Sequence, residues 1–211
     1  MLTLIFAISA CSTIGKKPLN QQSQVDWVQY QLEAGRINQW DLRGRAAIFV
    51  DDDVHNVGLS WQRDEDDFVM ILEAPFGQGV MRIESSYETD LPIKLSLPDG
   101  QVVYGQDAET TLQSVVGWSI PVNGLVFWIK GLPQKSDSFS HLLNADGRLE
   151  SLLQNGWRIN FLNYFDFDDP AKGLPSKLYL KHEKLALKIV IEYWQKPESL
   201  TSNPELFPEF N

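Results

Sequence analysis

The sequence predicts a mainly β protein in which about eleven strands follow one another in antiparallel succession. Three observations support this prediction: apolar and polar residues alternate over long stretches, turn signals separate these stretches, and only three short segments show helical spacing. With 211 residues, the chain can bury one sizeable core. Consecutive hairpins of this length curl into a barrel or half-barrel, which can hold one ligand inside.

The N-terminal residues differ in character from the rest of the chain. Leu2 to Ala10 form an apolar run that is too short to span a membrane as a helix, and Cys11 follows directly. This stretch resembles a bacterial lipobox, so residues 1–10 are expected to be a lipoprotein signal peptide and Cys11, the only cysteine, the site of lipid attachment. An ordinary buried cysteine is the alternative. The polar residues 11–24 are expected to form the lipid anchor and a flexible tether.

A helix is expected to open the folded domain, which we place at residues 25–196. From Val25 to Ala34 the apolar residues, including Val28 and Leu32, recur at helical spacing, and Gly35 follows as a stop signal. We therefore expect an amphipathic helix.

Period-two alternation then predicts six strands. Turn signals separate them, among them the acidic turn Asp64–Asp67, the loop Pro75–Gly79 and the turn Pro98–Gly100. The strands are expected over residues 40–50, 57–61, 68–74, 80–85, 91–97 and 101–105. The strand that begins at Phe68 is apolar on both faces, so the alternation does not say which of its faces is buried.

Two short helices are expected in the middle of the chain. Asp107 is a predicted N-cap and Gly117 a predicted stop for the first, and the second is expected over Leu125–Lys130. Both must cover apolar surface, because Trp118 and Trp128 would otherwise lie in water.

Five further strands are predicted after these helices. They are expected over residues 139–143, 148–153, 157–165, 177–182 and 186–194, with a two-residue hairpin turn at Asn155-Gly156. Residues 197–211 are rich in Pro, Ser and acid, and are expected to be disordered.

Composition argues against several classes of function. The chain has 28 acidic and 18 basic residues and a formal net charge of −10, and no window concentrates Lys and Arg, so nucleic-acid binding is not expected. A single cysteine rules out a disulfide framework and a zinc site built on several thiolates. Seven Trp residues suggest a wide apolar interior or a surface that meets lipid.

No catalytic or metal-binding set is recognisable in the sequence. His55, His141 and His182 lie far apart in the chain, and Ser60 and Ser119 lack the glycine-flanked elbow of a hydrolase nucleophile. The acidic clusters at Asp51–Asp53 and Asp64–Asp67 lack the spacing of calcium ligands and are expected to be solvated turns. Arg45 is expected to point to solvent. We therefore predict no enzyme, no metal and no cofactor.

Several short motifs, in their order along the chain, resemble the LolB family of outer-membrane lipoproteins. The motifs are the lipobox, Trp40-Asp41-Leu42-Arg43-Gly44-Arg45, Ala74-Pro75-Phe76-Gly77, Gly117 to Gly131-Leu132-Pro133, Asn155-Gly156-Trp157, Leu174-Pro175 and Trp194. The resemblance covers residues from Val25 to about Trp194. Ser12 follows the cysteine instead of the Asp that retains many enterobacterial lipoproteins in the inner membrane, which implies an outer-membrane location.

The resemblance implies an incomplete antiparallel barrel of eleven strands with a helical lid over an apolar cavity. It also implies that the protein accepts acylated lipoproteins from a LolA-like periplasmic carrier and inserts them into the outer membrane. The implied partners are that carrier, the acylated cargo and outer-membrane lipid, and we expect a monomer. Alternation assigns the following strand residues to the acyl-chain cavity: Trp40, Leu42, Ile48, Leu59, Trp61, Met70, Leu72 and Leu95. The expected lid adds Val115, Trp118, Leu125 and Trp128.

The loop that contains Pro75, Phe76 and Gly77 is the expected membrane-insertion element. Phe76 lies at a hairpin tip, where contact with a packed core is difficult, and the family carries an apolar residue associated with insertion at the matching position. The alternative is that Phe76 folds back onto its own sheet.

Two other functions remain open at the level of sequence. A lipoprotein that binds another lipid would have the same cavity chemistry. A structural lipoprotein that scaffolds an envelope complex would use its aromatic residues only as core, and a filled interior that fails to bind an acyl probe would indicate it.

Overall fold

The computed structural model describes residues 21–85, 90–135, 138–166, 169 and 171–195. The expected signal peptide, Cys11 and the expected disordered tail lie outside these residues.

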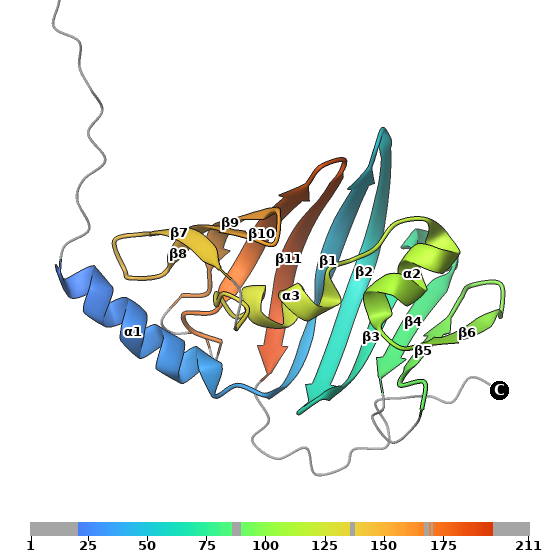
Figure 1. Cartoon of the computed structure of the whole chain (residues 1–211), viewed down its shortest axis with the longest axis horizontal. Helices are drawn as coiled ribbons and strands as arrows, with labels where there is room; N and C mark the ends of the chain where they lie inside the picture. Colours follow the sequence, from blue (N-terminus) through green and yellow to red (C-terminus); the bar gives the residue numbers. More distant parts are fainter. Residues whose placement is uncertain (1–20, 86–89, 136–137, 167–168, 170, 196–211) are drawn as a thin grey trace, which may run out of the picture.

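Eleven strands form one antiparallel sheet in the order β6-β5-β4-β3-β2-β1-β11-β10-β9-β8-β7 (Figure 1). The strands are β1 (Gln39–Val50), β2 (Asp53–Asp64), β3 (Asp67–Glu73), β4 (Val80–Ser85), β5 (Ile93–Ser96), β6 (Val102–Gly105), β7 (Phe139–Leu143), β8 (Leu149–Gln154), β9 (Trp157–Tyr164), β10 (Pro175–His182) and β11 (Leu185–Gln195). The sheet is open, with β6 at one edge and β7 at the other. The predicted incomplete barrel is thus confirmed.

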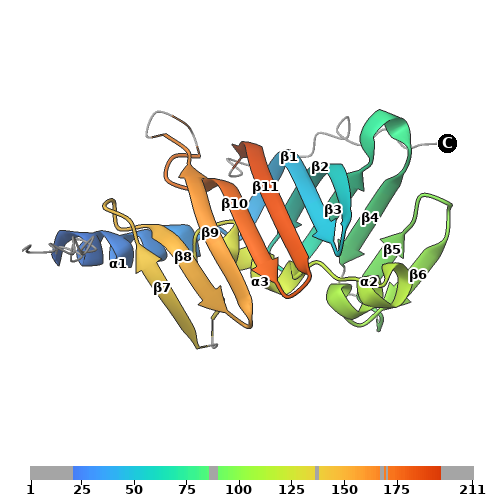
Figure 2. The same cartoon turned by 90° about the horizontal axis from the view of Figure 1, so that it is seen from above.

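The first and last strands pair at the centre of the sheet. The β1–β11 register runs from Asp41 opposite Gln195 to Val50 opposite Leu185, and every other neighbouring pair is consecutive in sequence. The chain that leaves β6 must therefore cross to the opposite edge to begin β7. Helices α2 (Ala108–Val116) and α3 (Val122–Trp128) lie on this crossing, over one face of the curved sheet (Figures 1 and 2).

Strand alternation places the core on the face that the helices cover. Trp40, Leu42, Ala46 and Ile48 of β1 are buried, while Arg45 is exposed and forms an ion pair with Glu192 on the outer face. In β3, the strand with two apolar faces, the structure buries the following residues: Phe68, Met70 and Leu72.

Local signals explain where the lid helices begin and end. The Asp107 carboxylate accepts a hydrogen bond from the Thr110 amide, and Gly117 ends α2 with a left-handed φ of 82°. Helix α3 begins at Val122, earlier than the predicted Leu125, and Gly124 lies inside it instead of before it. Glycine is needed at this position because the Trp128 ring packs against it so closely that a Cβ would collide with the ring.

Helix α1 (Gln21–Gly35) corrects the prediction for the N-terminal helix. The apolar face predicted from Val28 and Leu32 is exposed, at 56% and 57% respectively, whereas Trp27 and Ala34 are buried. Trp27 packs its ring 5.7 Å from that of His141 on β7. The helix face that carries Trp27, the larger apolar side chain, packs against the sheet instead of the face that carries Val28 and Leu32. The helix also begins before Val25, within the segment that was predicted to be a tether.

Gly44 marks a close approach between the two central strands. The β1–β11 register shifts between Arg43 and Gly44, and a Cβ on Gly44 would collide with the carbonyl oxygen of Val190. Because the oxygen belongs to the backbone and the backbone fixes the position of a Cβ, side-chain rotation does not relieve the collision.

We expect Gly44→Ala to lower the free energy of unfolding by about 2–3 kcal/mol, measured by urea denaturation. Gly58→Ala is the matched control, since Gly58 lies on the adjacent strand and its Cβ would make only ordinary contacts with Glu73. That control should be neutral or stabilising by up to about 1 kcal/mol. Equal effects of the two substitutions would contradict the role of the β1–β11 approach.

Candidate functional site

The lid and the sheet enclose an apolar cavity of about 20 Å³. This volume holds about one water molecule, so the lid fills the space that the sheet offers. The cavity is lined by Ala46, Ile48, Leu59, Trp61, Met70, Leu72, Ile120, Leu125, Ile129, Leu187 and Ile189. No polar surface faces this cavity, so the lid and the sheet meet there through apolar side chains.

The predicted cavity residues fall into three groups. Ile48, Leu59, Trp61, Met70, Leu72 and Leu125 line the cavity. Trp40, Leu42, Leu95 and Trp128 are buried in the core around it. Val115 and Trp118 are only partly buried, and Trp118 stacks 6.2 Å from the His55 ring on a separate surface depression.

Sequence reasoning missed part of the lining. Leu187 and Ile189 of β11 contribute to the cavity floor because β11 pairs with β1 at the centre of the sheet. Their alternation was visible in the sequence, but the pairing that places them opposite the lid was not.

Gln154 fastens the lid to strand β8. Its Oε1 accepts hydrogen bonds from the Trp128 Nε1–H at 3.0 Å and from the Gln134 amide at 2.8 Å. Its Nε2 donates to the Gln134 carbonyl oxygen at 2.9 Å. Because Gln154 is 1% exposed, these bonds have no water to replace them, and they hold the end of α3 against the sheet.

A cluster of tryptophans lies beside the cavity. The Trp40 ring makes an edge contact with Trp61 at 5.8 Å and stacks on Trp194 at 5.9 Å. All three indole N–H groups are buried, and none has a hydrogen-bond acceptor among the described residues. Buried donors usually have partners, so three such groups in one cluster are unusual.

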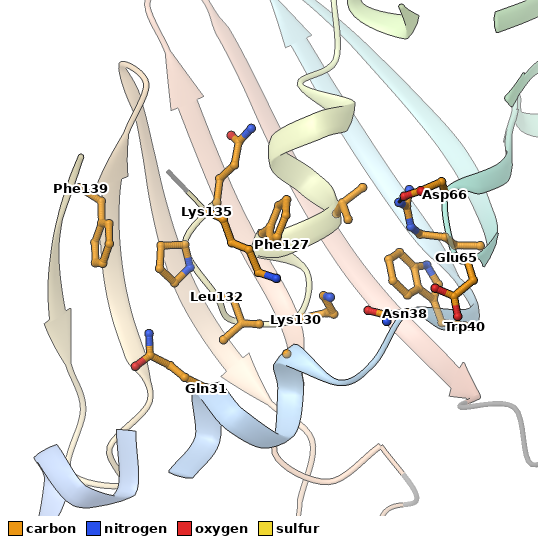
Figure 3. A pocket seen from close by; sticks show the side chains of 15 residues that line it. Gln31, Asn38, Trp40, Glu65, Asp66, Phe127, Lys130, Leu132, Lys135 and Phe139 are labelled. Atoms are coloured by element: carbon orange, nitrogen blue, oxygen red, sulfur yellow. Dashed lines mark hydrogen bonds and ion pairs between the residues drawn. The ribbon is translucent and has the colours of Figure 1, made fainter. Parts of the chain in front are cut away.

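A second hollow, of about 570 Å³, opens beside this cluster (Figure 3). We call it the lysine groove. It lies between the end of α1, the segment after α3 and the β2–β3 turn, and its lining mixes apolar and charged side chains. The lining includes Asn38, Trp40, Arg63, Glu65, Asp66, Phe127, Lys130, Leu132, Lys135 and Phe139.

Lys130 is the buried cation of the groove and was not anticipated from sequence. It is 4% exposed, its Nζ donates to the Ile37 carbonyl oxygen at 2.9 Å, and Nζ lies 5.3 Å from the centre of the Trp40 ring. Among the described residues no carboxylate forms an ion pair with it. Burial, with a smaller contribution from the nearby charges of Arg63 and Lys135, lowers the pKa of Lys130 to about 8.

The Pro75–Gly77 turn presents Phe76 to solvent. The Phe76 side chain is 98% exposed, and its backbone adopts a left-handed conformation with φ 59° and ψ 25°. A hydrogen bond of 2.8 Å from the Ala74 amide to the Gly79 carbonyl oxygen closes the loop. A bulky residue rarely adopts positive φ, so the loop holds the ring outward at some conformational cost.

Other candidate sites provide no binding constellation. Within the described ranges, no group of three or more His, Cys, Asp or Glu side chains is arranged to hold a metal ion. In the acidic turns, Asp51 pairs with Lys184 and Asp66 with Arg63. No helix in the described part of the chain is long and apolar enough to cross a membrane.

The matching family and the two relatives given below share one description. The family described as outer membrane lipoprotein LolB matches residues 38–194, which begin one residue before β1 and end one residue before the end of β11. An outer-membrane lipoprotein LolB of Nitrosococcus oceani is 31% identical over 92% of this chain and 95% of its own length. One from Francisella tularensis is 30% identical over 92% of this chain and 91% of its own.

Among solved structures, a LolA superfamily protein from Nitrosomonas europaea has a TM-score of 0.49 with 6% sequence identity. It covers 90% of this chain and 99% of its own.

We expect Gln154→Leu to loosen the lid. The substitution leaves the Trp128 and Gln134 groups without their partner, so the free energy of unfolding should fall by about 2–3 kcal/mol. Hydrogen exchange of the α3 amides should accelerate more than that of the β1 amides. Gln101→Leu, at an exposed turn, is the control and should change neither quantity. Uniform acceleration across the sheet and lid would contradict a fastening role.

Lys130 should impose a pH dependence on stability. Its pKa is about 8 when folded and about 10.4 when unfolded, so the unfolded chain binds more protons between these values and stability rises with pH there. The difference in unfolding free energy between the unsubstituted protein and Lys130→Met should rise from pH 8 to pH 10, by at most about 1.4 kcal/mol per pH unit. Burial raises the pKa of Tyr30 and Tyr164, but both proteins share this contribution. A flat difference would contradict the lowered pKa.

Proposed function

The chain belongs to the LolB family of outer-membrane lipoproteins, and from that premise we propose that it accepts acylated lipoproteins from a periplasmic carrier and inserts them into the outer membrane. It acts as the receptor at the outer membrane in lipoprotein localisation. The carrier is LolA-like, and the shared feature of the cargo is its acyl chains. The anchor of the receptor itself is Cys11.

The observation that supports this proposal best is the entirely apolar lining of the cavity between lid and sheet. Leu125 and Ile129 of the lid segment cover an apolar surface formed by β1, β2, β3 and β11. When α3 moves away, an acyl chain can occupy the same surface. One apolar contact then replaces another, so the cost of opening lies mainly in the polar contacts of the lid segment. These include the hydrogen bond of Trp128 with Gln154 and those of Lys130 with Tyr30 and Ile37.

This exchange gives the graded affinity that delivery requires. An acyl chain that must displace the lid binds less tightly than it would bind a preformed cavity, because part of its binding free energy opens the lid. Each CH₂ buried in a bilayer contributes about 0.8 kcal/mol without that cost. Transfer of the acyl chains from the receptor to the membrane therefore lowers the free energy and needs no nucleotide.

A filled interior alone does not distinguish a receptor from a structural scaffold, because the lid would fill the interior of either kind of protein. Binding of an acyl probe separates them. We assign the protein no catalytic step, since the proposed transfer makes and breaks no covalent bond.

Phe76 is proposed to start insertion at the membrane. Its ring lies in solvent at the tip of the β3–β4 connection, and an exposed aromatic side chain enters the lipid interface favourably. The loop thus offers contact with the bilayer separately from the lid–sheet interface that holds the cargo.

The test follows cargo in two steps, from loaded carrier to the full chain and from the full chain to liposomes. We expect stoichiometric acceptance without ATP. Phe76→Glu should keep acceptance within about twofold and slow placement in the bilayer about tenfold or more, because a charge opposes insertion of the loop. Leu162→Glu, an equally charged substitution at an exposed site on β9, should change neither step.

Three outcomes would contradict the proposal or part of it. Equal loss of both steps in Phe76→Glu would refute a separate insertion role for the loop. Failure of the unsubstituted protein to accept cargo, with an acyl probe still bound, would indicate another lipid as ligand. Failure to bind any acyl probe would indicate a scaffold.

A further inference from the structure

The lysine groove has no role in the function proposed so far. We propose that it binds the carbonyl-rich linkage of an acylated cysteine, namely the ester and amide groups that join the acyl chains to the polypeptide. This inference rests on the proposed function and adds to it a polar site for the cargo.

The first argument is the unpaired charge of Lys130. An ammonium group has three N–H donors, and one of them is used by the Ile37 carbonyl oxygen. The Trp40 and Phe127 rings lie 5.3 and 5.7 Å from Nζ and stabilise the cation weakly. A buried charge without a counter-ion is costly, and a ligand that brings acceptor oxygens supplies the missing partners.

The second argument is an excess of hydrogen-bond donors among the residues that line the groove. The Trp40 Nε1–H is buried without an acceptor among the described residues, and Lys135 extends toward Lys130 (Figure 3). A lining rich in hydrogen-bond donors suits a ligand group that has acceptors and few donors, such as an acyl ester. The carboxylates of Glu65 and Asp66 also line the groove, and their charge disfavours a phosphate.

The third argument is continuity with the apolar interface. Trp40 lines the groove and touches Trp61, which lines the cavity under the lid. The lid segment likewise gives Phe127 to the groove and Leu125 to the cavity. A ligand whose linkage lies in the groove can therefore pass its acyl chains under the lifted lid.

The fourth argument is the position of the groove relative to the membrane loop. Asp66 lies just before β3 and Phe76 lies just beyond its end, so the groove and the loop are at opposite ends of a seven-residue strand. At about 3.4 Å per residue, they are roughly 20 Å or more apart. When Phe76 contacts the bilayer, a polypeptide that leaves the groove points away from the membrane.

The test compares two ligands on the full chain carrying Cys11→Ser, which keeps the protein free of its own lipid. One ligand is a synthetic triacylated cysteine lipopeptide, and the other is the same molecule with both glyceryl esters replaced by ethers. Affinity is measured by displacement of a fluorescent fatty acid. We expect the ester ligand to bind about tenfold more tightly, since a hydrogen bond to a charged donor discriminates by about that factor.

Lys130→Met should reduce this preference to less than twofold and leave the affinity for the ether ligand unchanged. Met keeps most of the apolar stem of the side chain and removes the charge. Lys188→Met, at an exposed position of β11, is the matched control and should keep the tenfold preference. Thermal unfolding checks that each variant is folded. If Lys130→Met does not fold, the comparison of the ester and ether ligands on the protein with Lys130 intact tests the groove assignment.

Each contrary outcome has a distinct meaning. Equal affinity for the two ligands, or equal weakening of both by Lys130→Met, overturns the groove assignment and leaves the proposed function intact. Binding of neither ligand overturns both. A short-chain phosphatidylethanolamine carries the same esters, and tighter binding of this lipid than of the lipopeptide would overturn the assignment to an acylated cysteine.

Discussion

The pairing of the first strand with the last, at the centre of the sheet, is the constraint on which the rest of the structure depends. Because β1 and β11 are neighbours, β6 and β7 lie at opposite edges, and the chain between them must cross a whole face. The crossing segment cannot add a strand there, so it buries an apolar helical face on the sheet. The lid is thus a consequence of strand order, and the apolar surface that it covers is the one we propose for the acyl chains.

In the proposed function, the lid and an acyl chain compete for one surface, and this competition sets the affinity. Leu125 and Ile129 already satisfy the apolar surface beneath them, so a ligand gains only the difference between its own contacts and those of the lid. A deep, permanently open cavity would bind acyl chains more tightly and release them more slowly. A protein that passes acyl chains to a bilayer needs the weaker arrangement.

Three unfavourable features of the structure lie where function is proposed. Phe76 holds an exposed aromatic ring on a left-handed backbone, Lys130 is a buried cation without a carboxylate partner among the described residues, and Trp40 buries an indole N–H without an acceptor among them. Each lowers the stability of the folded protein by an amount that a purely structural design would avoid. Trp61 and Trp194, which contact Trp40, also bury indole N–H groups without an acceptor among the described residues.

The sequence by itself determined the elements, because hydrophobic periodicity and turn residues act over a few positions. Alternation predicted the eleven strands, the Asp107 cap predicted the start of α2, and Phe76 stood out between turn-forming residues. Tertiary structure decided what these elements pack against. It chose Trp27 over Val28 as the packed side of α1, and set Leu187 opposite the lid. It also buried Lys130, a residue that local pattern treats as a solvent-exposed charge. The physical reason is range: burial depends on contacts between residues a hundred or more positions apart, as between Tyr30 and the Lys130 carbonyl oxygen, and no local spacing records them.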